Sequence, residues 1–572
     1  MVDEELKFQR GDLESVMNAH PHVALWVKDF EAKWGSRPTY YGPLDKGAKK
    51  QEPLNLIYIT KEPIFVHIYQ PIAADGSKGR ILWFGLEPQL TDEEEDIRRK
   101  LVEVLLQEAP NNSGNFQTDA EFENILSSMV DRYTALDTDT RLATRRQGRI
   151  WEVLGMEDKR TIVTKEQRDR LRYVIIRDLI YNGPLQSLLS DESLEDIHSV
   201  GMKDIYMDHK VFKSVRSNIK FRQKNNLIRY LRSMSERIGR PVSDNKPIID
   251  GVLLDGSRIN IIFSDDVSLE GPSFTIRKFA EETISITQLI EWGTMSSQVA
   301  AYIWMCLEHG MSVLVSGETA SGKTTTLNAI LPFINHNVKI YSAEDTPEVK
   351  VKHKIWQRLV TRESKNEESR VEMFDLLKAA LRSRPRYIII GEIRGVEGAT
   401  AFQAMQTGHP VIATFHASSI VKMIQRFTGD PINVPIRFFD NLNFAIFQEV
   451  TESKGHMVRR ITGVDEVIGY NKHSDGVLTR GMFEWDPIKD KHHFRGMFQS
   501  HLLENKIAAL AGFENKRDVY DEVTRRTEAL QIMVDRGIIH YDDVFALLGL
   551  YYNGGWDAFR SAVDTWVILA ER

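Results

Sequence analysis

The sequence predicts an α/β fold for its central part, with α+β regions before it and a helical segment after it. Between residues 287 and 499 apolar strand-like runs alternate with helical stretches; before residue 286 strand and helix signals are mixed, and after residue 500 helical spacing dominates. We therefore expect four regions: an N-terminal α+β and helical region at 1–164, a second α+β domain at 165–286, an α/β domain at 287–499 and a helical region at 500–572.

The composition excludes several classes of protein. The 572 residues include 74 Lys plus Arg, 81 Asp plus Glu and 42% hydrophobic residues, which is neither a disordered nor a fibrous composition. A net charge of −7 has the wrong sign for a protein that mainly wraps nucleic acid. The single cysteine, Cys306, excludes disulfides within the chain and multi-cysteine zinc sites. With no apolar run near the ~20 residues of a membrane span, we expect a cytoplasmic protein that meets the membrane only through partners.

The first region contains two apolar strands, at residues 54–59 and 64–69. A helix is predicted to start after Thr91, because Thr91 and Glu94 have the spacing of a capping box. The acids at 92–96 fit the positive end of that helix better than a metal site. Farther on, four arginines are expected on one helix face, where a solvated surface is favoured over an anion site: Arg141, Arg145, Arg146 and Arg149.

The second region alternates helix and strand signals. Helices are predicted at 173–180 and 227–238, the first ending at Asn182-Gly183-Pro184 and the second at Gly239. Strands are predicted at 204–208, 258–263 and 274–277. This region therefore reads as α+β.

A glycine-rich loop in the third region carries the chemistry. An apolar strand from Ser312 runs into the pattern G-x-x-x-x-G-K-T and then into a helical sequence from Thr326, which is the context that a P-loop requires. The glycines let the backbone wind around a phosphate, Lys323 would reach the β- and γ-phosphates, and the Thr324 hydroxyl would bind Mg²⁺. The predicted nucleotide-binding residues are Gly317, Glu318, Thr319, Ala320, Ser321, Gly322, Lys323, Thr324 and Thr325.

Three later strands each end in a polar residue able to take part in phosphate chemistry. The strand at 339–341 leads to Glu344, the strand at 386–390 to Glu392, and the strand at 410–414 to His416. Helical stretches at 371–384 and 396–407 separate them, so we expect a mainly parallel sheet with its ligand crevice at the carboxyl ends of the strands. Each polar residue could instead be a helix cap or a satisfied buried group.

With these residues in view, the sequence resembles the type II/IV secretion and type IV pilus ATPases, within the RecA-like group, over roughly residues 165–470. The similar segments are the Walker A motif at 317–324, an aspartate box at 344–348, an unusual Walker B motif at 391–394, a histidine box at 407–417, and arginine-bearing strands at 255–259 and 274–278. The absence of clustered cysteines favours the archaeal branch. Residues 57–69 and the helical tail also resemble the archaellum assembly and motor ATPase.

The resemblance implies a RecA-like domain that hydrolyses ATP with Mg²⁺, a homo-hexamer, and a polytopic membrane platform protein as partner at the cytoplasmic face of the membrane. It also implies roles for single residues. Glu344 would polarise the attacking water, and Glu392 with Thr324 would hold the metal. Arg258 and Arg277 would add positive charge, and His409 and His416 would sense the γ-phosphate. A surface ion pair for either arginine, and a hydrogen-bonded core position for either histidine, remain alternatives.

Two other functions fit the P-loop pattern. A RecA-like nucleic-acid translocase or helicase would show nucleic-acid-stimulated turnover and salt-sensitive binding of single strands, although the net charge and the aspartate and histidine boxes count against it. A scaffold that ATP merely locks together would show no turnover. The sequence leaves open the filament that the machine builds and the direction of the motor.

Overall fold

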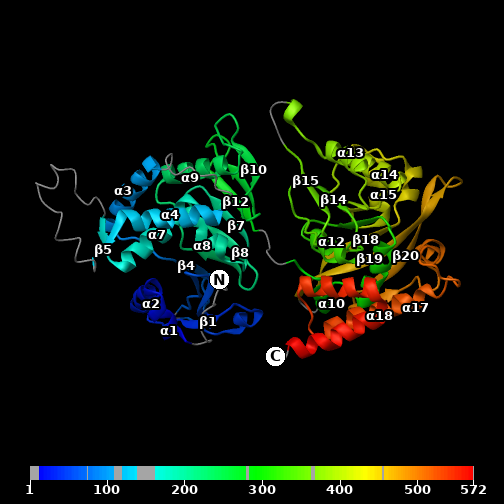
Figure 1. Ribbon diagram of the computed structural model, residues 1–572, viewed down its shortest axis with the longest axis horizontal. Helices are drawn as coiled ribbons and strands as arrows, with labels where there is room; N and C mark the ends of the chain where they lie inside the picture. The colour runs from blue at the N-terminus through cyan, green and yellow to red at the C-terminus, as the bar shows by residue number, and fades with distance from the viewer. Residues whose placement is uncertain are drawn as a thin grey trace, which may run out of the picture. The chain divides into compact units, whose positions relative to one another are not determined.

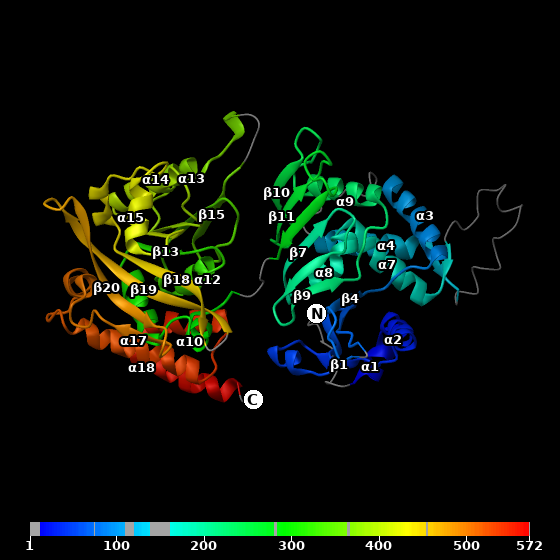
Figure 2. The ribbon, with the colours of Figure 1, turned by 180° about the vertical axis from the view of Figure 1, so that it is seen from behind.

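The computed structural model describes residues 12–73, 75–108, 119–137, 161–278, 283–362, 367–453 and 456–570. The chain divides into two compact units, Met1–Ala280 and Glu281–Arg572 (Figures 1 and 2). The arginine face predicted around residues 141–149 lies outside the described residues.

A ten-stranded sheet organises unit 1. Its strand order is β1-β2-β3-β4-β9-β8-β7-β12-β11-β10, and its neighbours are antiparallel except for β1 with β2 and β4 with β9. The strands are β1 (Thr39–Gly42), β2 (Asn55–Lys61), β3 (Ile64–Tyr69), β4 (Leu82–Leu86), β7 (Leu194–Val200), β8 (Tyr206–His209), β9 (Lys213–Ser217), β10 (Ile248–Val252), β11 (Arg258–Ile262) and β12 (Ser273–Arg277). Because β4 pairs with β9, the structure joins the two regions between which the sequence predicted a boundary at residue 165.

Helices pack around this sheet and form a second, smaller core. They are α1 (Leu13–Ala19), α2 (Pro21–Trp34), α3 (Asp92–Glu108), α4 (Asp119–Tyr133), α7 (Lys165–Leu179), α8 (Gln186–Ser190) and α9 (Lys224–Arg237), beside a two-stranded sheet of β5 (Thr134–Leu136) and β6 (Thr161–Val163). Buried residues of α3, α4 and α7 share one cluster that includes Leu101, Leu126 and Leu171. The predicted capping box at the start of α3 is confirmed, since Thr91 N donates to Glu94 at 3.0 Å and Glu94 N donates to Thr91 Oγ1 at 3.3 Å.

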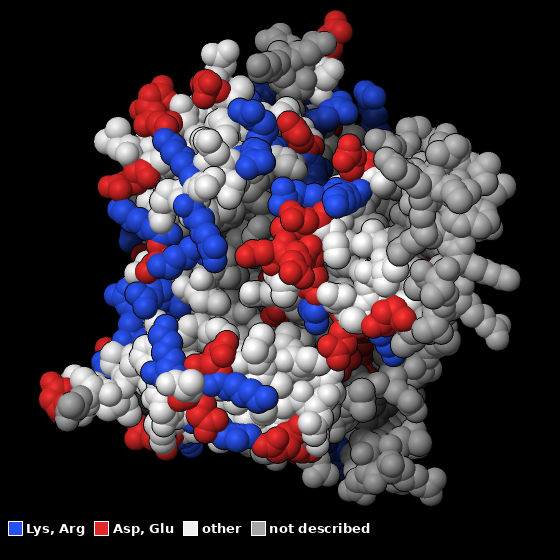
Figure 3. All heavy atoms as spheres, turned by 90° about the vertical axis from the view of Figure 1, so that its left-hand side faces the viewer, with Lys and Arg blue, Asp and Glu red and all other residues white. Residues whose placement is uncertain are grey.

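The face of the molecule drawn in Figure 3 carries side chains of both charges. On the face in Figure 3, Lys and Arg side chains lie beside Asp and Glu side chains, as expected for a chain of net charge −7. Among the described helices, none is both long enough and apolar enough to cross a membrane.

Unit 2 is built on a nine-stranded sheet of order β15-β14-β16-β17-β13-β18-β19-β20-β21. The first six strands in this order are parallel, which confirms the predicted parallel sheet, and the last three continue it as antiparallel strands. The strands are β13 (Val313–Gly317), β14 (Ile340–Glu344), β15 (Trp356–Val360), β16 (Tyr387–Ile390), β17 (Val411–Phe415), β18 (Phe444–Ser453), β19 (His456–Asn471), β20 (Gly476–Asp486) and β21 (Lys491–Phe494). The carboxyl ends of the parallel strands therefore share one edge of the sheet.

Helices flank this sheet, and the C-terminal ones belong to the same unit. They are α10 (Ile286–Glu291), α11 (Ser297–Glu308), α12 (Lys323–Ile330), α13 (Met373–Ser383), α14 (Glu397–Gln406), α15 (Ile420–Thr428), α16 (Ala508–Leu510), α17 (Val519–Asp535) and α18 (Tyr541–Ala570). Trp304 of α11, Leu530 of α17 and Leu547 of α18 lie in one buried cluster with Val313 of the central strand. The structure thus places residues 500–570, which the sequence predicted as a separate helical region, against the α/β core.

Candidate active site

The loop between β13 and α12 has the backbone of a phosphate-binding loop. Ala320 (φ +62°) and Gly322 (φ +94°) are left-handed, and turns of this kind direct successive N–H groups to one side. Gly317 has no room for a side chain, because a Cβ there would lie 2.1 Å from Gln448 O. The loop therefore requires small residues where the P-loop pattern has them.

Lys323 lies along this loop at the start of α12. Its Nζ donates to Glu318 O at 3.0 Å and lies 3.4 Å from His416 Nδ1. Burial lowers the pKa of Lys323, and the carboxylates of Glu392 and Glu348 act in the opposite direction. The predicted phosphate-binding lysine thus contacts the predicted histidine sensor.

Glu392 and His416 meet at the same edge of the sheet. Glu392 follows the end of β16 by two residues, and His416 directly follows β17. His416 Nε2 contacts Glu392 Oε1, while Arg394 Nε donates to Glu392 Oε2 at 2.7 Å. Burial and the neighbouring Lys323 lower the pKa of His416. Polar contacts therefore run from Lys323 through His416 to Glu392, across the ends of three strands.

Glu344 closes β14 and is fully buried. Its Oε1 accepts hydrogen bonds from Glu348 N at 2.6 Å and Val349 N at 2.7 Å. Its Oε2 has no hydrogen-bond partner in the described part of the chain and lies 3.6 Å from Arg358 Nε. Burial raises the pKa of Glu344. One oxygen thus fixes the loop after the strand, and the other faces Arg358 without a hydrogen bond.

The donors present suit Mg²⁺. Thr324 stands in the first turn of α12 and is half-buried. Its hydroxyl and the Glu392 carboxylate are hard oxygen donors, and Mg²⁺ in nucleotide sites takes few protein ligands besides phosphates and water. No cluster of three or more His, Cys, Asp or Glu that could hold a metal occurs among the described residues. Thr324 and Glu392 therefore offer donors that fit Mg²⁺ bound together with a nucleotide.

The structure does not bring every predicted site residue to this edge. His409 precedes β17, with Nδ1 3.1 Å from Thr407 Oγ1, and so lies at the opposite edge of the parallel sheet from His416. Arg258 and Arg277 belong to unit 1, where they face each other across β11 and β12. Arg277 Nε lies 3.2 Å from Asp196 Oδ1. This contact is a surface ion pair, the alternative to a catalytic role for this arginine. The sensor role of His409 and the catalytic roles of the arginines stay predictions.

Two residues at the phosphate loop were missed in the sequence. Gln448 on β18 donates from Nε2 to Ser321 O at 2.8 Å, and Arg459 on β19 donates from Nε to Ala320 O at 3.0 Å. The sequence holds a signal for Gln448, because the apolar run 444–447 ends at this polar residue, as the other strands of the site do. Arg459 has no such signal, since its position depends on the antiparallel pairing of β18 with β19.

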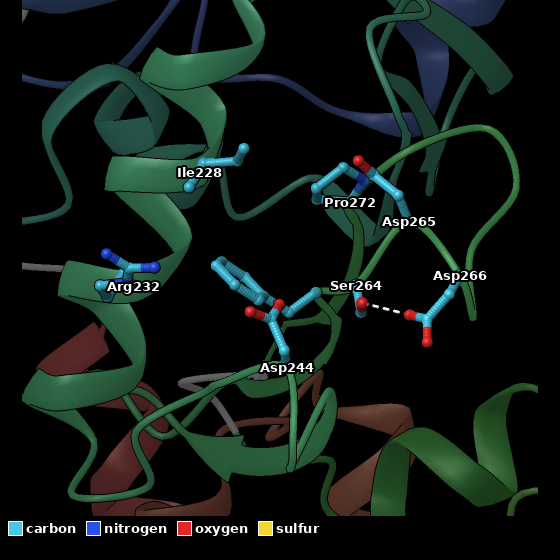
Figure 4. A pocket seen from close by; sticks show the side chains of 8 residues that line it. Ile228, Arg232, Asp244, Ser264, Asp265, Asp266 and Pro272 are labelled. Carbon is cyan, nitrogen blue, oxygen red and sulfur yellow. Dashed lines mark hydrogen bonds between the residues drawn. The ribbon is translucent and has the colours of Figure 1, made fainter.

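A hollow of about 390 Å³ in unit 1 does not compete as a nucleotide site. Figure 4 shows Arg232 on α9 beside the hollow, and Ser264 Oγ hydrogen-bonded to Asp266 Oδ1. Three carboxylates contribute to its lining, which disfavours an anionic ligand. The residues around it are Ile228, Arg232, Asp244, Phe263, Ser264, Asp265, Asp266 and Pro272.

The parallel sheet, the phosphate loop and the acidic and histidine side chains at its edge define a RecA-like P-loop ATPase. A family model described as "Type II/IV secretion system protein" matches residues 179–432. An uncharacterised protein of Methanocaldococcus jannaschii is 47% identical over 546 residues, which are 95% of this chain and 97% of that protein. The chain belongs to the type II/IV secretion system ATPase family.

More distant similarities cover less of the chain. The conjugal transfer protein TrbB of Rhizobium radiobacter is 32% identical over 268 residues, 46% of this chain and 75% of that protein. Among solved structures, the ATPase DotB of Legionella pneumophila aligns with 15% identity and a TM-score of 0.36, over 64% of this chain and 94% of that one.

Proposed function

We propose that this chain is a hexameric motor that hydrolyses ATP to power assembly of a type IV pilus-like filament, the archaellum or an archaeal pilus, and rotation where the filament is an archaellum. Two features of the site support hydrolysis. Lys323, His416 and Glu392 contact one another in a continuous chain. The buried Glu344 keeps one carboxylate oxygen, Oε2, without a hydrogen-bond partner among the described residues. Family membership supports the coupling to a secretion or pilus machine.

Each polar side chain of the site has a role in the proposed hydrolysis of ATP. A water oxygen forms a bond to the γ-phosphorus, the bond from that phosphorus to the β–γ bridging oxygen breaks, and ADP leaves with its electron pair. Oε2 of Glu344 accepts the proton that the water loses. Lys323 neutralises charge on the β- and γ-phosphate oxygens, and His416 links that lysine to Glu392. Thr324 and Glu392 would hold Mg²⁺, which would supply positive charge against the phosphate oxygens.

The motor part of the proposal concerns partners. A ring of six copies at the cytoplasmic face of the membrane, bound to a polytopic platform protein, follows from the resemblance to filament motors. Arg258 and Arg277 of unit 1 would then add positive charge at a γ-phosphate, in their own chain or in a neighbouring copy.

The decisive experiment measures ATP turnover of the purified protein, alone and with membranes that carry the platform protein. We expect turnover that the platform-containing membranes raise, and loss of one filament type in a deletion strain. Stimulation by single-stranded nucleic acid instead of by membranes would favour the translocase. Tight ATP binding without turnover under all conditions would leave only the scaffold.

A further inference from the structure

The hairpin of β18 and β19 holds the phosphate loop from outside at two neighbouring carbonyl groups. Nε2 of Gln448 donates to Ser321 O at 2.8 Å. Nε of Arg459 donates to Ala320 O at 3.0 Å. Two side chains from one hairpin therefore fix two successive peptide groups of the loop.

Gln448 is itself fixed. Its side chain is 1% exposed, and its Oε1 accepts a hydrogen bond from Thr326 Oγ1 at 2.6 Å. Because Ser321 O can only accept a hydrogen bond, the amide nitrogen of Gln448 must face it. Gln448 also lies opposite Gly317 in the pairing of β13 with β18. The amide thus bridges the loop and the second turn of α12 from a rigid strand.

Arg459 contacts the loop where its backbone is least favourable. Ala320 has a left-handed φ of +62°, a conformation that a residue with a Cβ rarely adopts. Arg459 bonds the carbonyl of this residue and passes over the next glycine, since a Cβ on Gly322 would lie 3.2 Å from Arg459 Cδ. The bond from Arg459 therefore stabilises the strained part of the turn.

We propose that Gln448 and Arg459 are positioning residues for nucleotide phosphates. The carbonyl and the following N–H of a peptide group point in opposite directions. The hydrogen bond from Gln448 holds Ser321 O away from the phosphate side of the loop. The N–H of Gly322, which belongs to the same peptide group, is therefore fixed toward the phosphate side. The hydrogen bond from Arg459 to Ala320 O fixes the peptide group between Ala320 and Ser321. The N–H of that group, on Ser321, donates to Glu318 O at 3.3 Å and closes the turn. The hairpin sets the shape of the loop before a nucleotide arrives.

This inference rests on the proposed nucleotide site, and the test uses full-length protein with a fluorescent ADP analogue. The variants are Arg459→Gln and Gln448→Glu, which replaces the donor nitrogen by an oxygen facing Ser321 O. Arg459→Lys is the conservative rescue. Arg480→Gln is the matched control, because Arg480 lies on β20, donates to Gln499 O and does not touch the loop.

We expect each loop variant to bind ADP about tenfold more weakly, the effect of losing one hydrogen bond that preorganises the site. KM for ATP should rise similarly, while kcat stays within about twofold because saturating nucleotide restores the loop. Hydrogen exchange of residues 317–325 without nucleotide should be faster in both variants. Arg459→Lys should recover part of the affinity, and Arg480→Gln should resemble wild type.

Unchanged ADP affinity in both loop variants would overturn the proposal. A lower kcat with unchanged affinity would also overturn it, since Arg459 would then act on the transition state instead of on the loop. If Gln448→Glu does not fold, the exposed Arg459→Gln decides alone. Lys323→Ala distinguishes failure of this proposal from failure of the nucleotide-site assignment, because wild-type ADP binding in that variant would mean that the nucleotide site itself is misassigned.

Discussion

Oε2 of Glu344 lies 3.6 Å from Nε of Arg358, while Oε1 of the same carboxylate is held by two backbone N–H groups. Arg358 is on the edge strand β15, and its guanidinium stacks on the ring of Trp356 at 5.1 Å. A proton-accepting carboxylate must be ionised, and burial works against ionisation of Glu344. The arginine supplies the opposing charge.

Arg358→Gln should therefore lower turnover more at pH 6 than at pH 8. Removing the cation raises the pKa of Glu344 further, so the acid limb of the kcat/KM profile moves to higher pH. Glu348, the other charged group acting on Glu344, already pushes its pKa upward. The control is Arg362→Gln, whose guanidinium bonds Ser369 O instead. An acid limb that does not move would separate Arg358 from the charge state of Glu344.

Glu344→Gln should keep magnesium-ATP binding near the wild-type level while turnover falls by about 100-fold or more. The substitution preserves the size of the side chain and an acceptor for the N–H groups of Glu348 and Val349, but removes the base. Equilibrium nucleotide binding and steady-state turnover, measured on the same preparation, distinguish the two effects. Equal loss of both would make Glu344 a structural residue.

Lys323→Ala should abolish hydrolysis and strongly weaken ATP binding. Lys323 is the only lysine or arginine within residues 317–325, so no other side chain of that loop can replace its positive charge. The exposed turn variant Lys472→Ala is the matched loss of one positive charge. Isothermal binding of ATP and a phosphate-release assay measure the two effects. Wild-type turnover in Lys323→Ala would contradict the P-loop assignment.

Unit 1 should lose stability in acid because of His67. Trp26 Nε1 donates to His67 Nδ1 at 3.1 Å, and His67 Nε2 contacts Asn55 Oδ1 at 2.7 Å. The neutral ring therefore has a hydrogen-bond partner at both of its nitrogens. Burial lowers the pKa of His67 to about 3. The folded unit therefore excludes a proton that the unfolded chain binds below pH 6.5, and stability falls as the pH drops from 6.5 toward 3.

From pH 7 to pH 5 this histidine alone should cost about 2 kcal/mol in the free energy of unfolding. Urea unfolding followed by hydrogen exchange of peptides in β2 and β3 measures the loss. His67→Gln should have lower stability at pH 7 and a shallower dependence on pH. An equally steep dependence in that variant would assign the acid sensitivity to other groups.

The sequence predicts the site best where one strand carries one functional residue. Glu344, Glu392 and His416 each follow an apolar run, and parallel strands bring such residues to one edge. His409 shows the limit of motif reasoning. It shares the histidine box with His416, yet β17 runs between them, and a five-residue strand spans roughly 17 Å.

Long-range pairing accounts for what the sequence did not predict. β4 and β9 are separated by more than one hundred residues, and their pairing turns two predicted regions into one unit. The antiparallel strands after β18 place Arg459 at the phosphate loop, although it lies far from that loop in the sequence. Local propensity carries no information about such contacts.

Arg258→Ala and Arg277→Ala should each lower turnover far more than nucleotide affinity. A guanidinium near the γ-phosphate stabilises charge that develops mainly in the transition state, so its loss costs rate before it costs ground-state binding. Both residues belong to unit 1, whereas the phosphate loop belongs to unit 2, so the effect should require both units. Arg216→Ala on β9, which removes an ion pair with Asp204, is the control within unit 1.

A shortened chain tests the same point without substitutions. A chain that starts at residue 283 keeps Ser285, which caps α10 and donates to Ile539 O at 2.6 Å, and so retains the described contacts of unit 2 at its start. We expect it to bind ATP but to hydrolyse it at least tenfold more slowly than the full chain, since no arginine of unit 1 is present. Turnover is measured beside equilibrium binding of a fluorescent nucleotide for the full chain, both arginine variants and the shortened chain. Undiminished turnover in the shortened chain would show that unit 1 supplies no catalytic charge, and Arg277 would then serve only its ion pair with Asp196.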